Sequence, residues 1–212
     1  MDKKRAKTTL RKIWHFIWED NSVWSWIVNI ILAFVLIKFI VYPGLGFLLG
    51  TSYPIVAVVS ESMEHNNAKF DDWWQSNKDW YENIGIDRQK FESFLLKNGF
   101  NKGDIMVLLG QDVKDIKIGD VIVYRTVMKD PIIHRVVNIT NYNGKVYFQT
   151  KGDNNKDFIK SPILDERRIS SENLIGKAVF RIPFFGYIKI IFVDYITKPY
   201  CSATNNLFPC RS

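Results

Sequence analysis

Ser62 is the residue of this 212-residue chain whose neighbours most favour nucleophilic chemistry. It stands in the segment Ser60-Glu61-Ser62-Met63, shortly after a long apolar run. A serine hydroxyl is a weak nucleophile until a neighbouring group takes its proton. The base must titrate near neutrality, as histidine does, or be a lysine whose charge is suppressed by burial.

The chain has three histidines, and two of them follow the apolar run. His15 precedes the run, His65 comes soon after Ser62, and His134 lies in the apolar segment Pro131–Val137. Strand alternation puts His134 on an apolar face, where a lone histidine is commonly a satisfied core residue. Ser62 is otherwise short of a base, so His134 and His65 are both candidates.

A third group should orient the imidazole of the base. The segment Thr150–Asp157 carries two carboxylates, Asp153 and Asp157, and follows the strand expected to pair with that of His134. Gly-Asp-Asn-Asn is also ordinary turn chemistry, in which an aspartate bonds its own backbone. The sequence makes either carboxylate a candidate third member and does not separate them.

The apolar run from Val23 to Val41 is long enough to cross a bilayer. Asn29 and Lys38 are among its few polar residues, and Trp24 lies near one end, where interfacial aromatics are expected. No small-residue cleavage pattern follows closely, so we expect a permanent anchor, 22–49, and not a signal peptide. The basic N-terminus, 1–21, predicts a cytoplasmic start, which places the rest outside the cytoplasm.

After the anchor, the chain reads mostly as short strands joined by tight turns, so we expect a mainly β fold: a compact antiparallel β domain, 50–198. The expected strands are Pro54–Ser60, Asp104–Leu109, Val121–Val127, Ile132–Ile139, Lys145–Thr150 and Leu174–Ile182. The segment 70–101 is rich in charge and aromatics with near-helical spacing, which predicts a small inserted helical segment. Its tryptophans either form a satellite core or contact a membrane surface as a lid.

Three further features carry weaker expectations. The apolar stretch Ile182–Ile196 contains Pro, Gly, Lys and Asp, which favours a strand pair or a surface segment over a second membrane crossing. Cys201 and Cys210 lie in the tail, 199–212, and either form a small disulfide loop or stay unlinked. The net charge of +7 is concentrated at the N-terminus, and no basic stripe interleaved with aromatics indicates nucleic-acid binding.

Five boxes in order give the chain a resemblance to the type I signal peptidases, in their archaeal and endoplasmic-reticulum branch. The boxes are Ser60-Glu61-Ser62-Met63-Glu64-His65, Gly119-Asp120-Val121-Ile122-Val123-Tyr124, Ile133-His134-Arg135-Val136, Lys151-Gly152-Asp153-Asn154-Asn155 and Ile175-Gly176-Lys177-Ala178. The resemblance implies Ser62 as nucleophile, His134 as general base and Asp157 as the acid, with Asp153 supporting the loop or sharing that role. Glu61 and His65 depart from the Gly and Pro common in the family, and Asp157 follows Asp153 more closely than is usual.

The resemblance also implies an activity, which is removal of N-terminal signal peptides from preproteins. The substrate would lie as an extended strand along an exposed edge, which makes Ala57, Val58, Val59, Ser60 and Met63 the expected substrate-binding residues. The partners would be signal peptides, the bilayer of the cell membrane, crossed once, and a protein translocation channel, with no metal or organic cofactor and no nucleic acid. A serine peptidase for other envelope proteins and a non-catalytic peptide-binding β domain are the alternatives.

Overall fold

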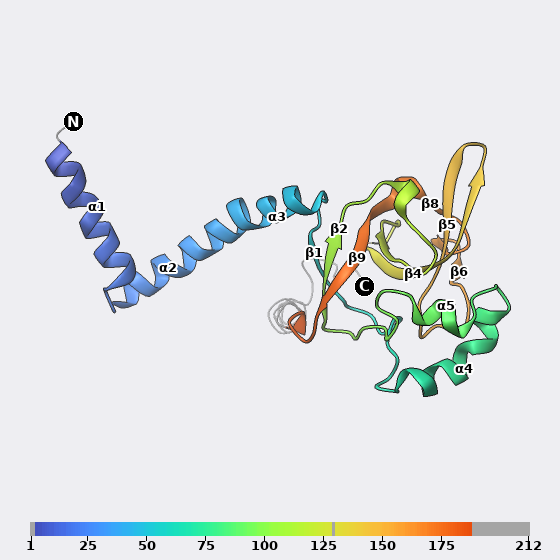
Figure 1. Cartoon of the computed structure of the whole chain (residues 1–212). Coiled ribbons are helices and arrows are strands. Elements are labelled where there is room, and N and C mark those ends of the chain that lie inside the picture. The colour runs from blue at the N-terminus through green and yellow to red at the C-terminus, as the bar shows by residue number, and fades with distance from the viewer. Residues whose placement is uncertain (1–2, 129, 188–212) are drawn as a thin grey trace, which may run out of the picture. The chain divides into compact units, whose positions relative to one another are not determined.

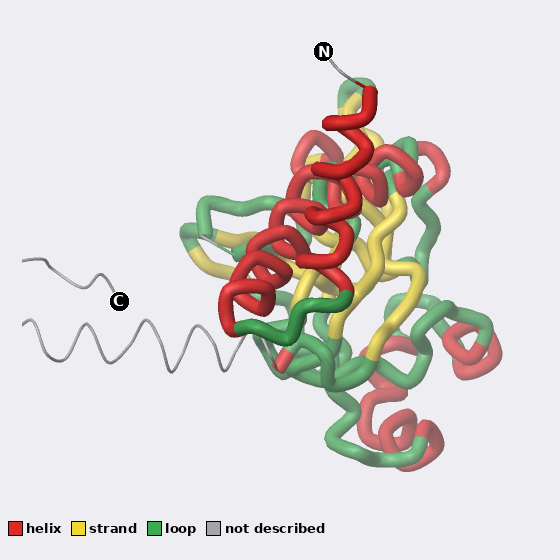
Figure 2. Tube along the Cα trace, turned by 90° about the vertical axis from the view of Figure 1, so that its left-hand side faces the viewer, coloured by secondary structure: helices red, strands yellow, loops and turns green. Residues whose placement is uncertain are grey.

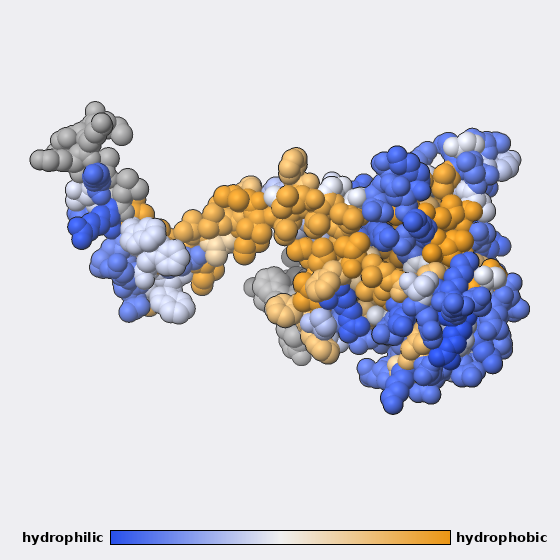
Figure 3. Space-filling model, in the orientation of Figure 1, coloured by the Kyte–Doolittle hydropathy of each residue, from blue (hydrophilic) through white to orange (hydrophobic). Residues whose placement is uncertain are grey.

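The computed structural model describes residues 3–128 and 130–187, and the chain divides into two compact units with their boundary between Leu48 and Leu49. The first unit begins with helix α1 (Lys3–Trp18), followed by α2 (Val23–Leu36), the π-helical segment η1 (Ile37–Val41) and α3 (Tyr42–Leu49). The span Val23–Leu49 has a mean hydropathy of 2.2, and Figure 3 shows its apolar side chains in orange at the surface. Its length and composition suffice to cross a membrane.

The polar residues at the start of this span and the proline within it are explained by local contacts and backbone geometry. Ser22 caps α2 by accepting a hydrogen bond from the Ser25 amide at 3.2 Å. The Asn29 side chain donates to the Ile17 carbonyl at 2.9 Å, which ties α2 to α1. Pro43 is the second residue after the π segment, where the wider turn accommodates a residue that has no amide hydrogen.

The second unit is built on one seven-stranded sheet with the order β1-β2-β9-β3-β4-β5-β8, in which every neighbouring pair is antiparallel. Figures 1 and 2 show these strands lying side by side, and β6 with β7 forms a separate small hairpin. The strands are β1 (Ile55–Ala57), β2 (Ile105–Leu109), β3 (Val121–Tyr124), β4 (Ile132–Tyr142), β5 (Lys145–Lys151), β6 (Lys160–Ser161), β7 (Leu164–Asp165), β8 (Ile169–Ser170) and β9 (Leu174–Ile182). The mainly β, antiparallel prediction is confirmed.

Both faces of the sheet centre are buried, which explains the continuous apolar run of β3. Val121 and Val123 pack with Met106, Leu108 and other residues in one core, while Ile122 and Tyr124 face a second core around Phe148. This is the two-residue alternation of a strand buried on both sides. Among the strands of residues 3–128 and 130–187, β1 pairs only with β2, and none of them pairs with its other edge.

The inserted segment is helical, with α4 (Phe70–Glu82) and α5 (Arg88–Glu92) lying together beside the sheet (Figure 1). Trp73, Trp74, Tyr81 and Phe91 are buried in a third core with Val137 of β4. These aromatics therefore form a satellite core, which is the first of the two expectations for the insertion. Short 3₁₀ turns η2 (Val113–Asp115) and η3 (Ser171–Asn173) complete the unit.

The predicted strands match six of the observed ones within a few residues at either end, and β6, β7 and β8 were not predicted. The expectations for Cys201, Cys210 and the tail fall outside the described residues, as does most of the stretch Ile182–Ile196.

Candidate active site

Ser62 and His134 lie in contact although they are far apart in the sequence. Ser62 Oγ is 2.8 Å from His134 Nε2. Ser62 lies in a turn after β1, its carbonyl accepts the Asn154 amide at 2.8 Å, and His134 lies on β4, between β3 and β5 in the sheet. The Ser60 hydroxyl lies 3.0 Å from Ser62 Oγ, so a second hydroxyl borders the site.

The other imidazole nitrogen of His134 contacts the carboxylate of Glu166. His134 Nδ1 and Glu166 Oε1 are in hydrogen-bonding contact, and Glu166, which lies between β7 and β8 in the sequence, is fully buried. Thr150 Oγ1 also approaches Oε1 at 3.3 Å, and the Ile159 amide donates to Oε2 at 2.7 Å. Hydrogen bonds on both oxygens fix the carboxylate in one orientation.

The contact with Glu166 indicates which imidazole nitrogen of His134 carries the ring proton. An ionised carboxylate can only accept a hydrogen bond, so Nδ1 of His134 must carry the ring proton of the neutral tautomer. Nε2 then presents its lone pair to the Ser62 hydroxyl. A hydroxyl, an imidazole and a carboxylate in this order can transfer a proton from serine while a nucleophile forms.

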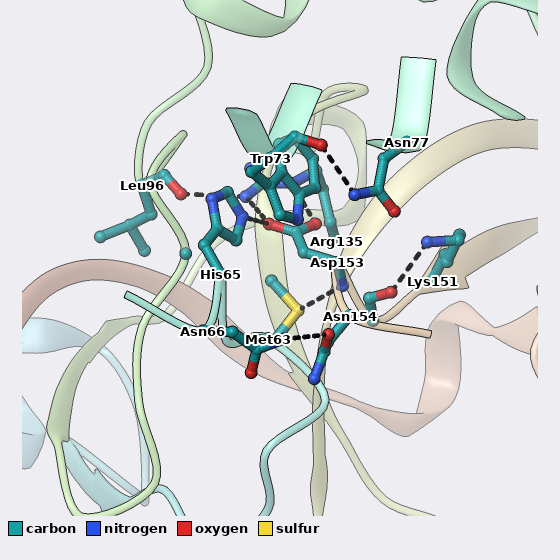
Figure 4. A network of polar contacts seen from close by, with 12 residues as sticks. Met63, His65, Asn66, Trp73, Asn77, Leu96, Arg135, Lys151, Asp153 and Asn154 are labelled. Carbon is teal, nitrogen blue, oxygen red and sulfur yellow. Dashed lines mark hydrogen bonds and ion pairs between the residues drawn. The ribbon is translucent and has the colours of Figure 1, made fainter. Parts of the chain in front are cut away.

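Asp153, one of the two predicted acids, does not contact His134. Its carboxylate is fully buried and accepts from Arg135 Nε at 2.9 Å and Nη2 at 2.6 Å, and it pairs with His65 Nε2 at 3.2 Å (Figure 4). Burial alone would raise the pKa of Asp153, but the charge and hydrogen bonds of Arg135 outweigh it and hold that pKa well below its usual range. Asp153 is thus the counterion of a buried arginine.

Arg135 connects several parts of this region. Its guanidinium donates to the carbonyls of Gly119, Leu95 and Leu96 at 3.0, 3.2 and 2.9 Å (Figure 4 shows the last). It also lies 4.9 Å from the ring centroid of Phe91. The segment Ile133-His134-Arg135-Val136 therefore contributes both the histidine of the site and the guanidinium that joins the sheet to the inserted segment.

The other two predicted partners lie elsewhere. Asp157 is exposed, and its carboxylate accepts from Trp80 Nε1 and from Lys160 Nζ, both at 3.2 Å. His65 stacks on Trp73 with 3.9 Å between ring centroids and bonds Asp153, so its imidazole belongs to the network of Arg135. The geometry therefore brings His134, and neither His65 nor Asp157, to Ser62.

Glu166 is the residue that the sequence analysis missed. It stands in the run Asp165-Glu166-Arg167-Arg168, which has the composition of a solvated loop. Asp165 is indeed paired with Arg167 outside, whereas the next side chain turns inward. The apolar residues just before it, Ile163 and Leu164, are the only signal of a nearby buried hairpin, and they do not single out the glutamate.

A cavity of about 450 Å³ opens beside the hydroxyl of Ser62. Of the predicted substrate-binding residues, Ala57, Val59 and Ser60 line it, together with Ile132 and Ile163. Val58 and Met63 do not, because both are buried in the core of the sheet, where the Met63 sulfur accepts the Asp153 amide at 3.4 Å. Alternation after β1 turns Val58 inward and its two neighbours toward the cavity.

Within residues 3–128 and 130–187, no group of three or more His, Cys, Asp or Glu side chains is placed to hold a metal ion.

No protein-family model matches the chain. The chain is 29% identical over 171 residues to the signal peptidase complex catalytic subunit sec11 of Sclerotinia sclerotiorum, covering 78% of this chain and 80% of the relative. It is 28% identical over 160 residues to the subunit SEC11 of Pyricularia oryzae, covering 74% of each. The human subunit SEC11C is 27% identical over 165 residues, or 73% of this chain and 65% of the relative.

Proposed function

We propose that the chain is a membrane-anchored serine endopeptidase that removes signal peptides from preproteins, as its motifs and its similarity to signal peptidase complex catalytic subunits indicate. The observation that carries the proposal is the contact series Ser62–His134–Glu166 beside an apolar cavity. The similarity to these subunits supports the class of reaction, and the geometry supports the assignment of its groups.

In the proposed mechanism, Ser62 Oγ attacks the scissile carbonyl carbon while His134 Nε2 accepts the hydroxyl proton. Glu166 stabilises the imidazolium, and the Ser62 amide is the proposed donor to the oxyanion. The imidazolium then gives its proton to the leaving amine as the peptide bond breaks. Water, deprotonated by His134, releases the acyl group from Ser62.

Glu166 takes the role that the sequence analysis gave to Asp157 or Asp153. It is the carboxylate in contact with His134 Nδ1, and its two oxygens are each held by a further donor. We propose that Asp153 supports the catalytic loop through Arg135, as one of the earlier expectations had it.

The substrate would bind as an extended strand at the free edge of β1. Main-chain hydrogen bonds to that edge would align the scissile bond with Ser62, and the cavity lined by Ala57, Val59 and Ile132 would take small apolar side chains. The anchor, 22–49, would hold the catalytic part, 50–198, at the bilayer outside the cytoplasm, which raises the effective concentration of a membrane-inserted preprotein. A translocation channel that delivers such preproteins is a proposed neighbour.

The test is cleavage of one model preprotein in membranes, with the product N-terminus mapped by mass spectrometry. Ser62→Ala should abolish the product and leave the protein folded. Ser76→Ala is the matched control, because it removes an exposed serine hydroxyl on α4 that does not line the cavity. Cleavage by the Ser62→Ala protein at the wild-type rate would end the enzyme proposal.

A further inference from the structure

Lys151 is a buried lysine next to the catalytic residues that the proposed mechanism does not use. It ends β5 and is only 1% exposed. Its ammonium donates to the Gly152 carbonyl at 3.0 Å, and Nζ lies 4.8 Å from the ring centroid of Trp80 and 5.1 Å from that of Tyr81. A cation taken out of water is costly unless other groups compensate, and here ring faces and a carbonyl do so.

The peptide that Lys151 holds is in direct contact with the catalytic pair. A Cβ added to Gly152 would lie 2.6 Å from the Ser62 carbonyl oxygen and 2.9 Å from His134 Nε2. No larger residue fits there without moving one of them. A small displacement of this glycine therefore changes the space in which the Ser62 hydroxyl and the imidazole meet.

The inserted helix α4 contacts this same loop at three points. The rings of Trp80 and Tyr81 face Lys151, the Tyr81 hydroxyl donates to Asp153 Oδ1 at 3.2 Å, and Trp80 Nε1 donates to Asp157 Oδ1 at 3.2 Å. Figure 4 shows Lys151 and Asp153 on the loop beneath the insertion. The insertion is thus a second support for residues 151–157, in addition to the sheet.

We propose that Lys151 is a positioning residue of this active site: its ammonium, held by the aromatic faces of α4, fixes the Gly152 carbonyl and so keeps the glycine against Ser62 and His134. The inference rests on the proposed peptidase function and adds a role for the insertion. It requires the lysine to be charged, because a neutral amine loses both the cation–π attraction and the charge-assisted hydrogen bond.

The charge of Lys151 is set by its surroundings in a way that can be tested. Burial lowers the pKa of Lys151 to about 8, against the attraction of the carboxylates that face it. The ionisable groups around it are Asp153 and Asp157 on its own loop, Glu166 after β7, Arg135 on β4 and Tyr81 on α4. Deprotonation above pH 8 should therefore loosen the loop and reduce kcat.

Stability should respond in the opposite direction, and this separates positioning from a structural role. The folded pKa of about 8 lies below the ordinary value of 10.5, so the unfolded chain binds more protons between these two pH values. The contribution of Lys151 to stability consequently rises with pH across this window. If Lys151 had a purely structural role, kcat would not fall as the pH rises through this window. A positioning role predicts that kcat falls while stability increases.

The experiment compares Lys151→Met with Lys156→Met, which removes an exposed lysine from the same loop. Lys151→Met keeps the apolar stem and removes a charge that is costly to bury, so its thermal midpoint should not fall. Its kcat for preprotein cleavage at pH 7 should drop about 10- to 100-fold, as expected for small misplacement of catalytic groups. KM should stay within about twofold, and the control should match the wild type.

Trp80→Leu should reproduce part of the loss and should lower the pH at which kcat begins to decline. A Lys151→Met protein that is folded and has wild-type kcat would overturn the inference. If that variant fails to fold, a wild-type kcat that does not decline between pH 7 and pH 9.5 overturns it instead. Ser62→Ala, assayed in parallel, reports separately on the proposed function, because cleavage by that variant refutes the peptidase whatever Lys151 does.

Discussion

Glu166→Gln is the substitution that most directly tests the assignment of the catalytic acid. It preserves the size of the side chain and replaces one carboxylate oxygen by an amide NH₂ group. Oε2 of Glu166 accepts the Ile159 amide at 2.7 Å, and that amide can only donate. The carbonyl oxygen of the glutamine must therefore face Ile159, which turns its NH₂ group toward His134 Nδ1.

The orientation of the glutamine decides the tautomer of His134. An NH₂ group at Nδ1 needs an acceptor there, so the ring proton moves to Nε2, and Nε2 then donates to Ser62 and cannot take its proton. The opposite orientation would turn the NH₂ group of the buried side chain toward the Ile159 amide, which is also a donor, at a cost of about 1–3 kcal/mol. That difference alone favours the inactive tautomer by about 5- to 140-fold, at about 1.4 kcal/mol per factor of ten.

The lost negative charge adds to this effect, because nothing then stabilises the imidazolium as it forms. A comparable acid-to-amide change in another serine protease lowers kcat about 10⁴-fold. We therefore expect Glu166→Gln to lower kcat about 10³- to 10⁴-fold with little change in KM.

The assay is the initial rate of preprotein cleavage, with thermal unfolding as the check on folding. Asp157→Asn is the matched control, since it makes the same chemical change at an exposed carboxylate and should keep kcat within about twofold. The reasoning would be refuted if Glu166→Gln kept more than a tenth of the wild-type kcat, or if Asp157→Asn lost as much as Glu166→Gln.

Three further predictions follow from the same loop and its supports. Gly152→Ala should lower kcat about 100-fold in a protein with an unchanged circular dichroism spectrum, because its Cβ would lie 2.9 Å from His134 Nε2. Arg135→Met leaves the buried Asp153 charge without its counterion, so urea unfolding should show a free energy of unfolding about 3–5 kcal/mol lower. The folded pKa of Asp153 lies below its ordinary value of 3.8, so its contribution to stability is present above that pH and is lost as pH falls toward the folded pKa. The thermal midpoint of the Ser62→Ala protein should accordingly fall steeply below about pH 4, and Asp153→Asn should remove that part of the fall.

The sequence predicts the parts of this fold that a local pattern determines. The apolar length of Val23–Leu49 is visible without coordinates, and so is the alternation that marks six strands of the sheet. β6, β7 and β8 are two residues each, which is too short for a period-two pattern to be recognised. These short strands also determine the position of Glu166. The sequence analysis missed Glu166 because it could not predict the strands around it.

The contact between Ser62 and His134, the proposed catalytic pair, could be predicted because few residues compete for these roles. Ser62 lies in a recognisable box, and His134 is one of only three histidines. Carboxylates are common in the chain. Asp153 and Asp157, like Glu166, met the expectation of a carboxylate on a loop that can reach the imidazole of His134. Choosing among them needs the register of the β6–β7 hairpin, which pairs Lys160 with Asp165 and turns the following residue inward.

The buried carboxylates of Asp153 and Glu166 have separate partners, and this separation explains why neither can replace the other. Asp153 receives two hydrogen bonds from Arg135, whose guanidinium also holds three carbonyls, so rotating Asp153 toward His134 would leave a buried cation unpaired. Glu166 is held by Thr150 and Ile159 and contacts the imidazole instead. A permanent positive charge thus holds the loop through Asp153, while Glu166 is left to balance the charge that His134 gains only during the reaction. For this reason a second substitution, Asp153→Asn in the Glu166→Gln background, should lower stability further without a comparable further loss of kcat.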